Sequence, residues 1–494
     1  MNEKSDTYKV YKSVSAQTLI TILTAIIEVV AFSLMSRLLT IQDFGYYAAV
    51  TAVSSLFAAF SDAGIGSAIV QRKTIDQKYI DNAFTLCLLF GLFSSSLLLV
   101  CSGPVAHYIA DETMQVPLML VSITLLTGTL SSISFSIMQK KLQFFRMGII
   151  RISALIFTTI VSIFLAIMGF GYYAIIAKVI LYSIITLFVS YIAAHTRYYL
   201  SFDLKVYKEI FGFGGWLMAS AFFRKIAEQI DRLMISSLFS VTILGMYSRP
   251  KEFINTMTGK LCDIFDSSLF PIFSSFQDRN EKLRNSYQSA LYYLNIVGLM
   301  ITLTFIFNSE LIIRIFLGTE WMSVNTLFIV LAVSGVLMIN GSLGDIYLRS
   351  LALTKQQFFL RILQSVASVI LILVAVHWGV LAIAFAYLSA YGFVVLFKMG
   401  YISNKINFGL RNSIILIVKS YQITLVYMPI YLLCRYLLPN TVENNIIKLC
   451  IFFLLTIGVF IFFPRIVGTK YKKEMHYIVV ELLRKRTIRN KQNV

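Results

Sequence analysis

Residues 379–397 read GVLAIAFAYLSAYGFVVLF, an apolar run that contains no charged side chain. A helix of about 20 apolar residues is long enough to cross the hydrocarbon core of a bilayer. Similar runs recur along the whole chain of 494 residues, of which 58% are hydrophobic and 14% are charged. Soluble domains usually have about a quarter of their residues charged. The sequence therefore predicts an all-α, polytopic integral membrane protein.

The apolar runs predict about 14 transmembrane helices by their length and number. The predicted spans lie near 13–38, 45–69, 83–103, 116–138, 147–168, 172–194, 211–238, 244–274, 289–308, 322–347, 360–376, 379–397, 413–437 and 446–464. The twelfth and fourteenth spans are apolar nearly all round, which is typical of helices that face lipid or protein core.

Lysines and arginines are distributed unevenly between the two sides of this arrangement. If the N-terminus is cytoplasmic, every second connection is cytoplasmic too, and these connections are rich in Lys and Arg, as in residues 139–146. The opposite connections hold almost none, and residues 104–115 are acidic. Because cytoplasmic loops are enriched in Lys and Arg, we expect both termini in the cytoplasm. We therefore attribute the net charge of +19 to the cytoplasmic side of the membrane protein rather than to nucleic-acid binding. The basic tail, 466–494, either lies along anionic lipid or is solvated.

The sequence contains no pattern for a metal, a cofactor or an external active site. Its five cysteines and four histidines are scattered, without a Cys-x-x-Cys pair or a Cys/His cluster. No connection is long enough to form a soluble catalytic domain. We therefore expect no cofactor, and we expect a non-enzymatic protein rather than a membrane-embedded glycosyltransferase or polymerase.

Polar side chains follow one face of four predicted helices, the first, second, seventh and eighth. A charge at mid-bilayer costs about 2.5–3.5 kcal/mol on insertion scales, so these faces are expected to line a shared hydrated cavity. The candidate substrate-binding cations are Arg224, Lys225, Arg232, Arg249, Lys251 and Lys260. The candidate residues for ion coupling or for pairing with these cations are Glu28, Asp62, Glu228, Asp231, Glu252 and Asp263.

An internal salt-bridge network is the alternative, because Arg224–Glu228, Glu228–Arg232 and Arg249–Glu252 have the spacing of intrahelical ion pairs. Arg151 and Lys178 are further cations inside the predicted spans, to which no role is assigned. Arg314 and Lys419 are more isolated, and for each of them snorkelling to the membrane surface and a functional role stay open.

The seventh and eighth predicted helices resemble a second copy of the first and second. A shift of 200 residues aligns Glu28 with Glu228, Ser36 with Ser236, Leu38 with Leu238, Gly45 with Gly245 and Tyr47 with Tyr247. With six helices in each copy, both copies enter the membrane from the same side, as in transporters built from parallel repeats. We expect six-helix lobes at 1–200 and 201–400 around a central cavity, two additional helices at 401–465, and the tail at 466–494.

Several motifs resemble those of the polysaccharide exporter family, which comprises O-antigen and exopolysaccharide flippases. Residues 37–47, RLLTIQDFGYY, are similar to the stretch after that family's first helix, and residues 62–72, DAGIGSAIVQR, are similar to the end of its second. Asp231-Arg232 with residues 244–248, LGMYS, resembles its seventh-helix signature, and residues 139–144, QKKLQF, its loop after helix four. The resemblance covers about residues 10–465 and is nearest to the colanic acid and teichuronic acid exporter branch.

The resemblance implies a fold of the multidrug/oligosaccharidyl-lipid/polysaccharide superfamily in the bacterial inner membrane. It implies transport of a polyprenyl-diphosphate-linked oligosaccharide from the cytoplasmic to the outer leaflet for cell-surface polysaccharide biosynthesis. The expected partners are this lipid-linked substrate, membrane lipids and polysaccharide-assembly proteins, and the expected state is a monomer. Two alternatives stay open: a cation-coupled multidrug antiporter of the same superfamily and a flippase for the lipid-linked peptidoglycan precursor.

Overall fold

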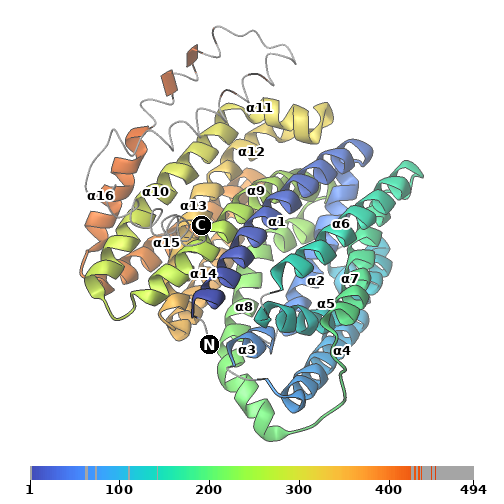
Figure 1. Ribbon diagram of the computed structural model, residues 1–494. Coiled ribbons are helices and arrows are strands. Elements are labelled where there is room, and N and C mark those ends of the chain that lie inside the picture. The colour runs from blue at the N-terminus through green and yellow to red at the C-terminus, as the bar shows by residue number, and fades with distance from the viewer. Residues whose placement is uncertain are drawn as a thin grey trace. The chain divides into compact units, whose positions relative to one another are not determined.

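Figure 1 shows the computed structural model of the chain. The structure describes residues 3–61, 65–72, 75–109, 112–141 and 143–423, with isolated positions between 428 and 451. Side chains are described in these ranges except at 3–19, 60, 61, 67, 71, 211–218 and 423. All regular secondary structure in this part of the chain is helical, so the predicted all-α fold is confirmed.

The helices follow the predicted spans closely. Their bounds are α1 Glu3–Leu38, α2 Ile41–Ser61, α3 Ile65–Gln71, α4 Gln77–Tyr108, α5 Gln115–Lys140, α6 Phe144–Ile167, α7 Tyr173–Ala194, α8 Leu204–Leu238, α9 Val241–Ser275, α10 Asn280–Phe307, α11 Ser309–Ile312, α12 Asn325–Ala332, α13 Ser334–Ser350, α14 Thr354–Ala375, α15 Val380–Lys405 and α16 Leu410–Ser420. Short helices with other hydrogen-bonding patterns are Glu112–Met114, Ile313–Leu317, Thr319–Val324, Val376–Trp378 and Tyr421–Ile423.

Two predicted spans are divided in the structure. The second is represented by α2 and α3, and residues 62–64 between them lie outside the described part. The tenth is divided at Val333 into α12 and α13. The fourteenth span and most of the thirteenth also lie outside the described residues, so the count of 14 stays a prediction.

Among the described residues, nine helices are long and apolar enough to cross a membrane. The protein is therefore a multi-pass membrane protein. The helices α8 and α9 are not among the nine, because charged residues interrupt their apolar sequence. These two helices carry most of the candidate site.

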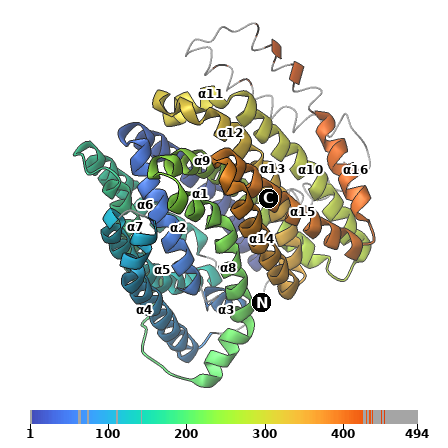
Figure 2. The same cartoon turned by 180° about the vertical axis from the view of Figure 1, so that it is seen from behind.

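Contacts along the chain define two compact units. The first contains residues 1–260, 313–330 and 354–391, and the second contains residues 261–312, 331–353 and 392–494. The lobes predicted at 1–200 and 201–400 stay a prediction. In the first unit α5 packs against both α4 and α7, as Figure 2 shows, while α6 packs on α1 and α8 packs on α2 and α14. In the second unit α10 packs on α13 and α16.

The starts of α2 and α9 approach each other closely within the first unit. A Cβ atom added at Gly45 would collide with the backbone oxygen of Val241, and one at Gly245 would collide with the backbone oxygen of Ile41. Ile41 and Val241 are themselves related by the 200-residue shift, so the two collisions are equivalent. The repeat detected in the sequence is therefore a reciprocal contact in the structure, and it requires residues without a side chain.

Candidate functional site

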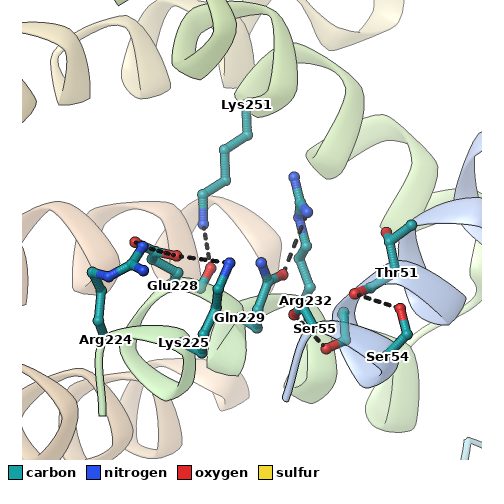
Figure 3. Close-up of polar contacts among 10 residues, drawn as sticks. Thr51, Ser54, Ser55, Arg224, Lys225, Glu228, Gln229, Arg232 and Lys251 are labelled. Carbon is teal, nitrogen blue, oxygen red and sulfur yellow. Dashed lines mark hydrogen bonds and ion pairs between the residues drawn. The ribbon is translucent and has the colours of Figure 1, made fainter. Parts of the chain in front are cut away.

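The half-exposed charges of the site lie on one stretch of α8, shown in Figure 3. Arg224 Nη1 lies 3.1 Å from Glu228 Oε1, and Lys225 Nζ lies 3.8 Å from Glu228 Oε2. The three side chains are 36%, 30% and 38% exposed for Arg224, Lys225 and Glu228. Two cations therefore share one carboxylate, which leaves a net positive charge at a place that solvent reaches.

Arg232 lies one turn further along α8 and has no carboxylate within ion-pair distance among the described residues. Its Nη1 atom donates to Gln229 Oε1 at 3.4 Å, and Gln229 lies between Arg232 and the Arg224–Glu228 pair in Figure 3. Its Nε atom is buried without a hydrogen-bond partner in the described part of the chain. A guanidinium that retains donors in this way is suited to binding phosphate or carboxylate oxygens.

Asp231 and Lys251 form a fully buried ion pair between α8 and α9. Their side chains are 0% and 2% exposed. The Tyr247 hydroxyl also donates to Asp231, and the Lys251 ammonium lies 3.8 Å from the ring centre of Tyr387 on α15. These contacts hold three helices of the first unit together and leave neither charge accessible in this conformation.

Arg249 joins α9 to α1 and α2. It donates to Ser36 Oγ at 2.8 and 3.1 Å and to the Phe32 carbonyl at 2.8 Å, and it pairs with Glu252 at 3.0 Å. Its guanidinium carbon lies 3.3 Å from the ring centre of Phe32 and 3.9 Å from that of Phe44. The Arg249 side chain is only 5% exposed, so it acts as a structural tie in this conformation.

Lys260 and Glu28 form an ion pair of 3.1 Å between α9 and α1, and both side chains are partly exposed, at 26% and 31%. The exposed apolar face of α1 contains Ile22, Ile26, Val30 and Leu34. Because these residues are spaced by four, Glu28 lies on the opposite side of the helix. Water therefore reaches Glu28 from the inward-packing side of α1 rather than from its lipid-type face.

Ten of the twelve candidate residues thus lie in the first unit. Nine of them take part in ion pairs, and the tenth, Arg232, has no ion-pair partner among the described residues. The predicted intrahelical pairs Arg224–Glu228 and Arg249–Glu252 form, whereas Arg232 bonds to Gln229 rather than to Glu228. Asp62 lies outside the described residues, and Asp263 is exposed and belongs to the second unit. Substrate binding and ion coupling by these residues stay predictions.

The hydroxyl groups of the predicted α2 stripe are bonded to their own helix. Thr51 donates to the Tyr47 carbonyl at 2.8 Å, and Ser55 donates to the Ala52 carbonyl at 2.9 Å. Their oxygens retain acceptor capacity but no free proton to donate. Among the described residues, no group of three or more His, Cys, Asp or Glu side chains gathers as a metal site would require.

Two further cations of the first unit, the exposed Arg151 on α6 and the partly buried Lys178 on α7, were given no role by the sequence. Each is the single charge within a long apolar segment, so helical periodicity provides no signal for it. The signal that identifies them is the energetic cost of an isolated charge in a membrane, about 2.5–3.5 kcal/mol on insertion scales.

Charged residues inside a helical membrane protein are typical of membrane transporters. The chain belongs to a family described as polysaccharide biosynthesis protein, whose model matches residues 34–326. The match confirms the predicted family and the prediction of a polysaccharide-biosynthesis transporter rather than an enzyme.

Three curated relatives are similar to this chain. The teichuronic acid biosynthesis protein TuaB of Bacillus subtilis is 24% identical over 64% of this chain and 67% of that protein. The lipopolysaccharide biosynthesis protein WzxC of Escherichia coli is 23% identical over 63% and 64%. The succinoglycan biosynthesis transport protein ExoT of Rhizobium meliloti is 21% identical over 52% of each. The chain thus spans about two thirds or less of these relatives' length.

Two solved structures share the fold. The lipid II flippase MurJ in an inward closed conformation superposes with a TM-score of 0.68 at 15% identity, covering 91% of this chain and 99% of MurJ. An inward-facing multidrug resistance MATE family transporter of the MOP superfamily gives 0.59 at 13% identity, covering 82% and 95%. At these identities the comparison establishes the fold class that the sequence predicted.

Proposed function

We propose that this protein is a flippase that moves a polyprenyl-diphosphate-linked oligosaccharide from the cytoplasmic to the outer leaflet of the bacterial inner membrane. The observation that carries the proposal is the uncompensated positive charge of Arg224, Lys225 and Arg232 on α8. A diphosphate carries one negative charge on each phosphoryl group, and arginine forks match its oxygens. The family and the named relatives support a polysaccharide precursor as the cargo.

In this mechanism the charged headgroup occupies a central cavity between the lobes 1–200 and 201–400, while the polyprenyl tail stays in lipid. Rocking of one lobe against the other changes which side of the membrane is open. Both termini are cytoplasmic, and the tail 466–494 lies at the inner leaflet. The protein works as a monomer alongside polysaccharide-assembly proteins.

The carboxylates of the site have two proposed roles. Asp231 and Glu252 hold the cations Lys251 and Arg249, because each of these ion pairs contains a buried cation. Glu28 is the best-placed carboxylate for coupling transport to proton or sodium entry, since it is 31% exposed on an inward-packing face. Glu228, Asp62 and Asp263 are the remaining candidates for such coupling.

Reconstitution into liposomes tests the function directly. The liposomes contain a polyprenyl-diphosphate oligosaccharide, and the assay scores protein-dependent movement of the headgroup between leaflets. Movement supports the flippase. Efflux of organic cations without headgroup movement would instead establish the multidrug antiporter. Movement of the lipid-linked peptidoglycan precursor in preference to other glycans would establish the second alternative.

A further inference from the structure

The connection between α7 and α8, residues 196–203, is an extended segment fixed to the side of α4. It contains no helix, and in Figure 1 it is the green trace that leads to the start of α8. Every second backbone N–H group along part of this segment donates to a buried side chain of α4. The donor and acceptor residues are Tyr199 and Asp81 at 3.1 Å, Ser201 and Thr85 at 2.9 Å, and Asp203 and Asn82 at 2.8 Å. Because buried polar groups are costly without hydrogen bonds, these three bonds hold the backbone of the segment in place.

The same segment exposes large apolar side chains. Leu200, Phe202 and Leu204, the first residue of α8, are 64%, 72% and 77% exposed. They alternate with Ser201 and Asp203, which are partly buried. The segment therefore has one side that is bonded to α4 and another that is apolar and uncovered. Exposed apolar side chains gathered in this way mark an interaction surface.

This apolar surface follows directly on the exposed surface of α7. Near the end of α7, Phe188, Tyr191 and Ile192 are 63%, 47% and 69% exposed. The helix is long and apolar enough to cross a membrane, and residue 196 comes two positions after its last residue, Ala194. The segment is therefore expected to lie where the hydrocarbon core meets the lipid headgroups, a level at which aromatic side chains are enriched.

The first turns of α8 add positive charge to this surface. Lys205 and Lys208 are both exposed, and neither has a carboxylate within ion-pair distance among the described residues. The neighbouring carboxylates are already in ion pairs, Asp203 with Lys78 at 2.6 Å and Glu209 with Arg72 at 3.6 Å. Lysine at a membrane interface buries its apolar stem and keeps its ammonium group among the headgroups, where anionic lipid attracts it.

We propose that the connection and the start of α8 form a membrane-docking surface. Leu200, Phe202 and Leu204 insert into the cytoplasmic leaflet, and Lys205 and Lys208 bind anionic lipid headgroups. The surface is separate from the proposed transport site and uses the proposed topology, in which α7 ends on the cytoplasmic side. It fixes the depth in the membrane at which α8, the helix of the candidate cations, begins.

Lipid fits this surface better than a second copy of the chain does. The apolar side chains follow a helix that is itself suited to lipid, and the lysines complement an anionic leaflet. Two copies that docked through the same surface would bring the lysines of both copies close together, and like charges oppose such a contact.

Fluorescence quenching in liposomes tests the surface without a transport assay. Phe202→Cys is made in the full chain after its five native cysteines are replaced by serine, and it is labelled with a bimane fluorophore. The liposomes contain equal amounts of phosphatidylcholine and phosphatidylglycerol, and one of the two carries bromine on its upper acyl chain as the quencher. The matched control is Asp278→Cys, because Asp278 is an exposed residue of the connection after α9, which is also predicted to be cytoplasmic.

Both lipids are expected to quench the label at position 202, and neither is expected to quench the label at position 278. Brominated phosphatidylglycerol is expected to quench about fivefold more than brominated phosphatidylcholine, the enrichment that one basic residue gives at an anionic surface. Lys205→Gln combined with Lys208→Gln is expected to make the two lipids equal. Lys141→Gln, a change of an exposed lysine after α5, is expected to keep the difference.

An absence of quenching by either lipid at position 202 would overturn the docking surface. If that label were also protected from iodide in the water, a protein partner would cover the surface instead. Equal quenching by the two lipids before the lysines are changed would overturn the binding of anionic headgroups. None of these outcomes depends on transport, so a protein that moves no headgroup in the flippase assay would overturn the proposed function alone.

Discussion

The two helix pairs related by the 200-residue shift share a backbone arrangement but not a chemistry. In α1 and α2 on one side, and in α8 and α9 on the other, a glycine makes the close approach at the equivalent position, Gly45 or Gly245. Of the ten candidate residues that the structure describes in the first unit, nine lie on the second pair and only Glu28 lies on the first. The residues of the first pair at the positions of Asp231, Arg232, Arg249, Lys251 and Glu252 are Ala31, Phe32, Ala49, Thr51 and Ala52.

The two helix pairs therefore share the glycine contact that packs them together, whereas the charged residues proposed for function lie mainly on the second pair. The glycine contact is reciprocal, so any change that removes it from one copy must disturb both. Nine of the ten described candidate residues belong to the second copy, and they include the buried Asp231 and Lys251 as well as the partly exposed cations of α8. The comparison therefore predicts symmetric effects for the glycines and asymmetric effects for the charged positions.

The largest expected effect comes from breaking the buried pair of the second copy. Lys251→Met leaves the Asp231 carboxylate buried without its cation and is expected to cost about 3–5 kcal/mol of stability. The measurement is thermal unfolding of the purified protein in detergent. The double variant Asp231→Asn with Lys251→Met removes both charges and is expected to recover much of the loss.

The equivalent position in the first copy provides the control. Thr51→Val removes a hydroxyl that bonds only to its own helix and is expected to cost about 1 kcal/mol or less. An equal loss in Lys251→Met and Thr51→Val would contradict the asymmetry between the copies.

The glycine contact is expected to give the next largest effect. Gly45→Ala and Gly245→Ala each insert a methyl group against the backbone of the other helix, at a cost of about 1–3 kcal/mol. The two losses are expected to be similar, and the double variant less than additive, because both methyl groups separate the same pair of helices. Melting temperatures of the three variants measure this.

Gly128→Ala in α5 serves as the matched control for the glycines. Nothing lies within 4 Å of a Cβ atom added there, so the substitution is expected to be neutral or to stabilise by about 0.5–1 kcal/mol. Strongly unequal losses at Gly45 and Gly245 would mean that the contact is not reciprocal.

The smallest effect is expected outside both copies, in the connection that leads into α8. The Asp203 carboxylate pairs with Lys78 at 2.6 Å, and the hydrogen bond from Lys78 holds the pKa of Asp203 below its ordinary value. A lowered folded-state pKa means that the pair stabilises the protein at neutral pH and that this contribution is lost as pH falls through that pKa.

The melting temperature of Asp203→Asn is therefore expected to lie slightly below that of the wild type at pH 7. The difference should shrink as the pH is lowered below about 4. A difference that stays constant between these pH values would show that the carboxylate's charge contributes nothing.

The sequence predicted the helices well because a membrane-spanning helix needs about 20 apolar residues, and runs of this length are visible in the sequence. The stripes on α8 and α9 were also visible, since Arg224–Glu228 and Arg249–Glu252 follow helical spacing. Burial was not predictable in the same way. Arg249 and Arg232 both lie on polar faces of predicted helices, but contacts with Ser36 and Phe32, more than 200 residues away, make Arg249 a link between helices.

The ion-pair partners of the other cations also come from distant parts of the sequence. Lys251 reaches Asp231 rather than a residue of its own helix, and Lys260 reaches Glu28 on α1. No spacing rule identifies such pairs from one sequence. Arg151 and Lys178 remained without a role for the opposite reason, because each is the single charge within its predicted span and thus belongs to no pattern.

The central claim is tested most directly by measuring headgroup movement in liposomes that contain the Arg232→Gln variant. The control is the Arg197→Gln variant, because Arg197 is an exposed arginine in the connection before α8. The account predicts protein-dependent movement of a polyprenyl-diphosphate oligosaccharide by the wild type and by the control, and a rate lower by about tenfold or more in Arg232→Gln. Equal rates in all three proteins would contradict the assignment of the diphosphate to the cations of α8.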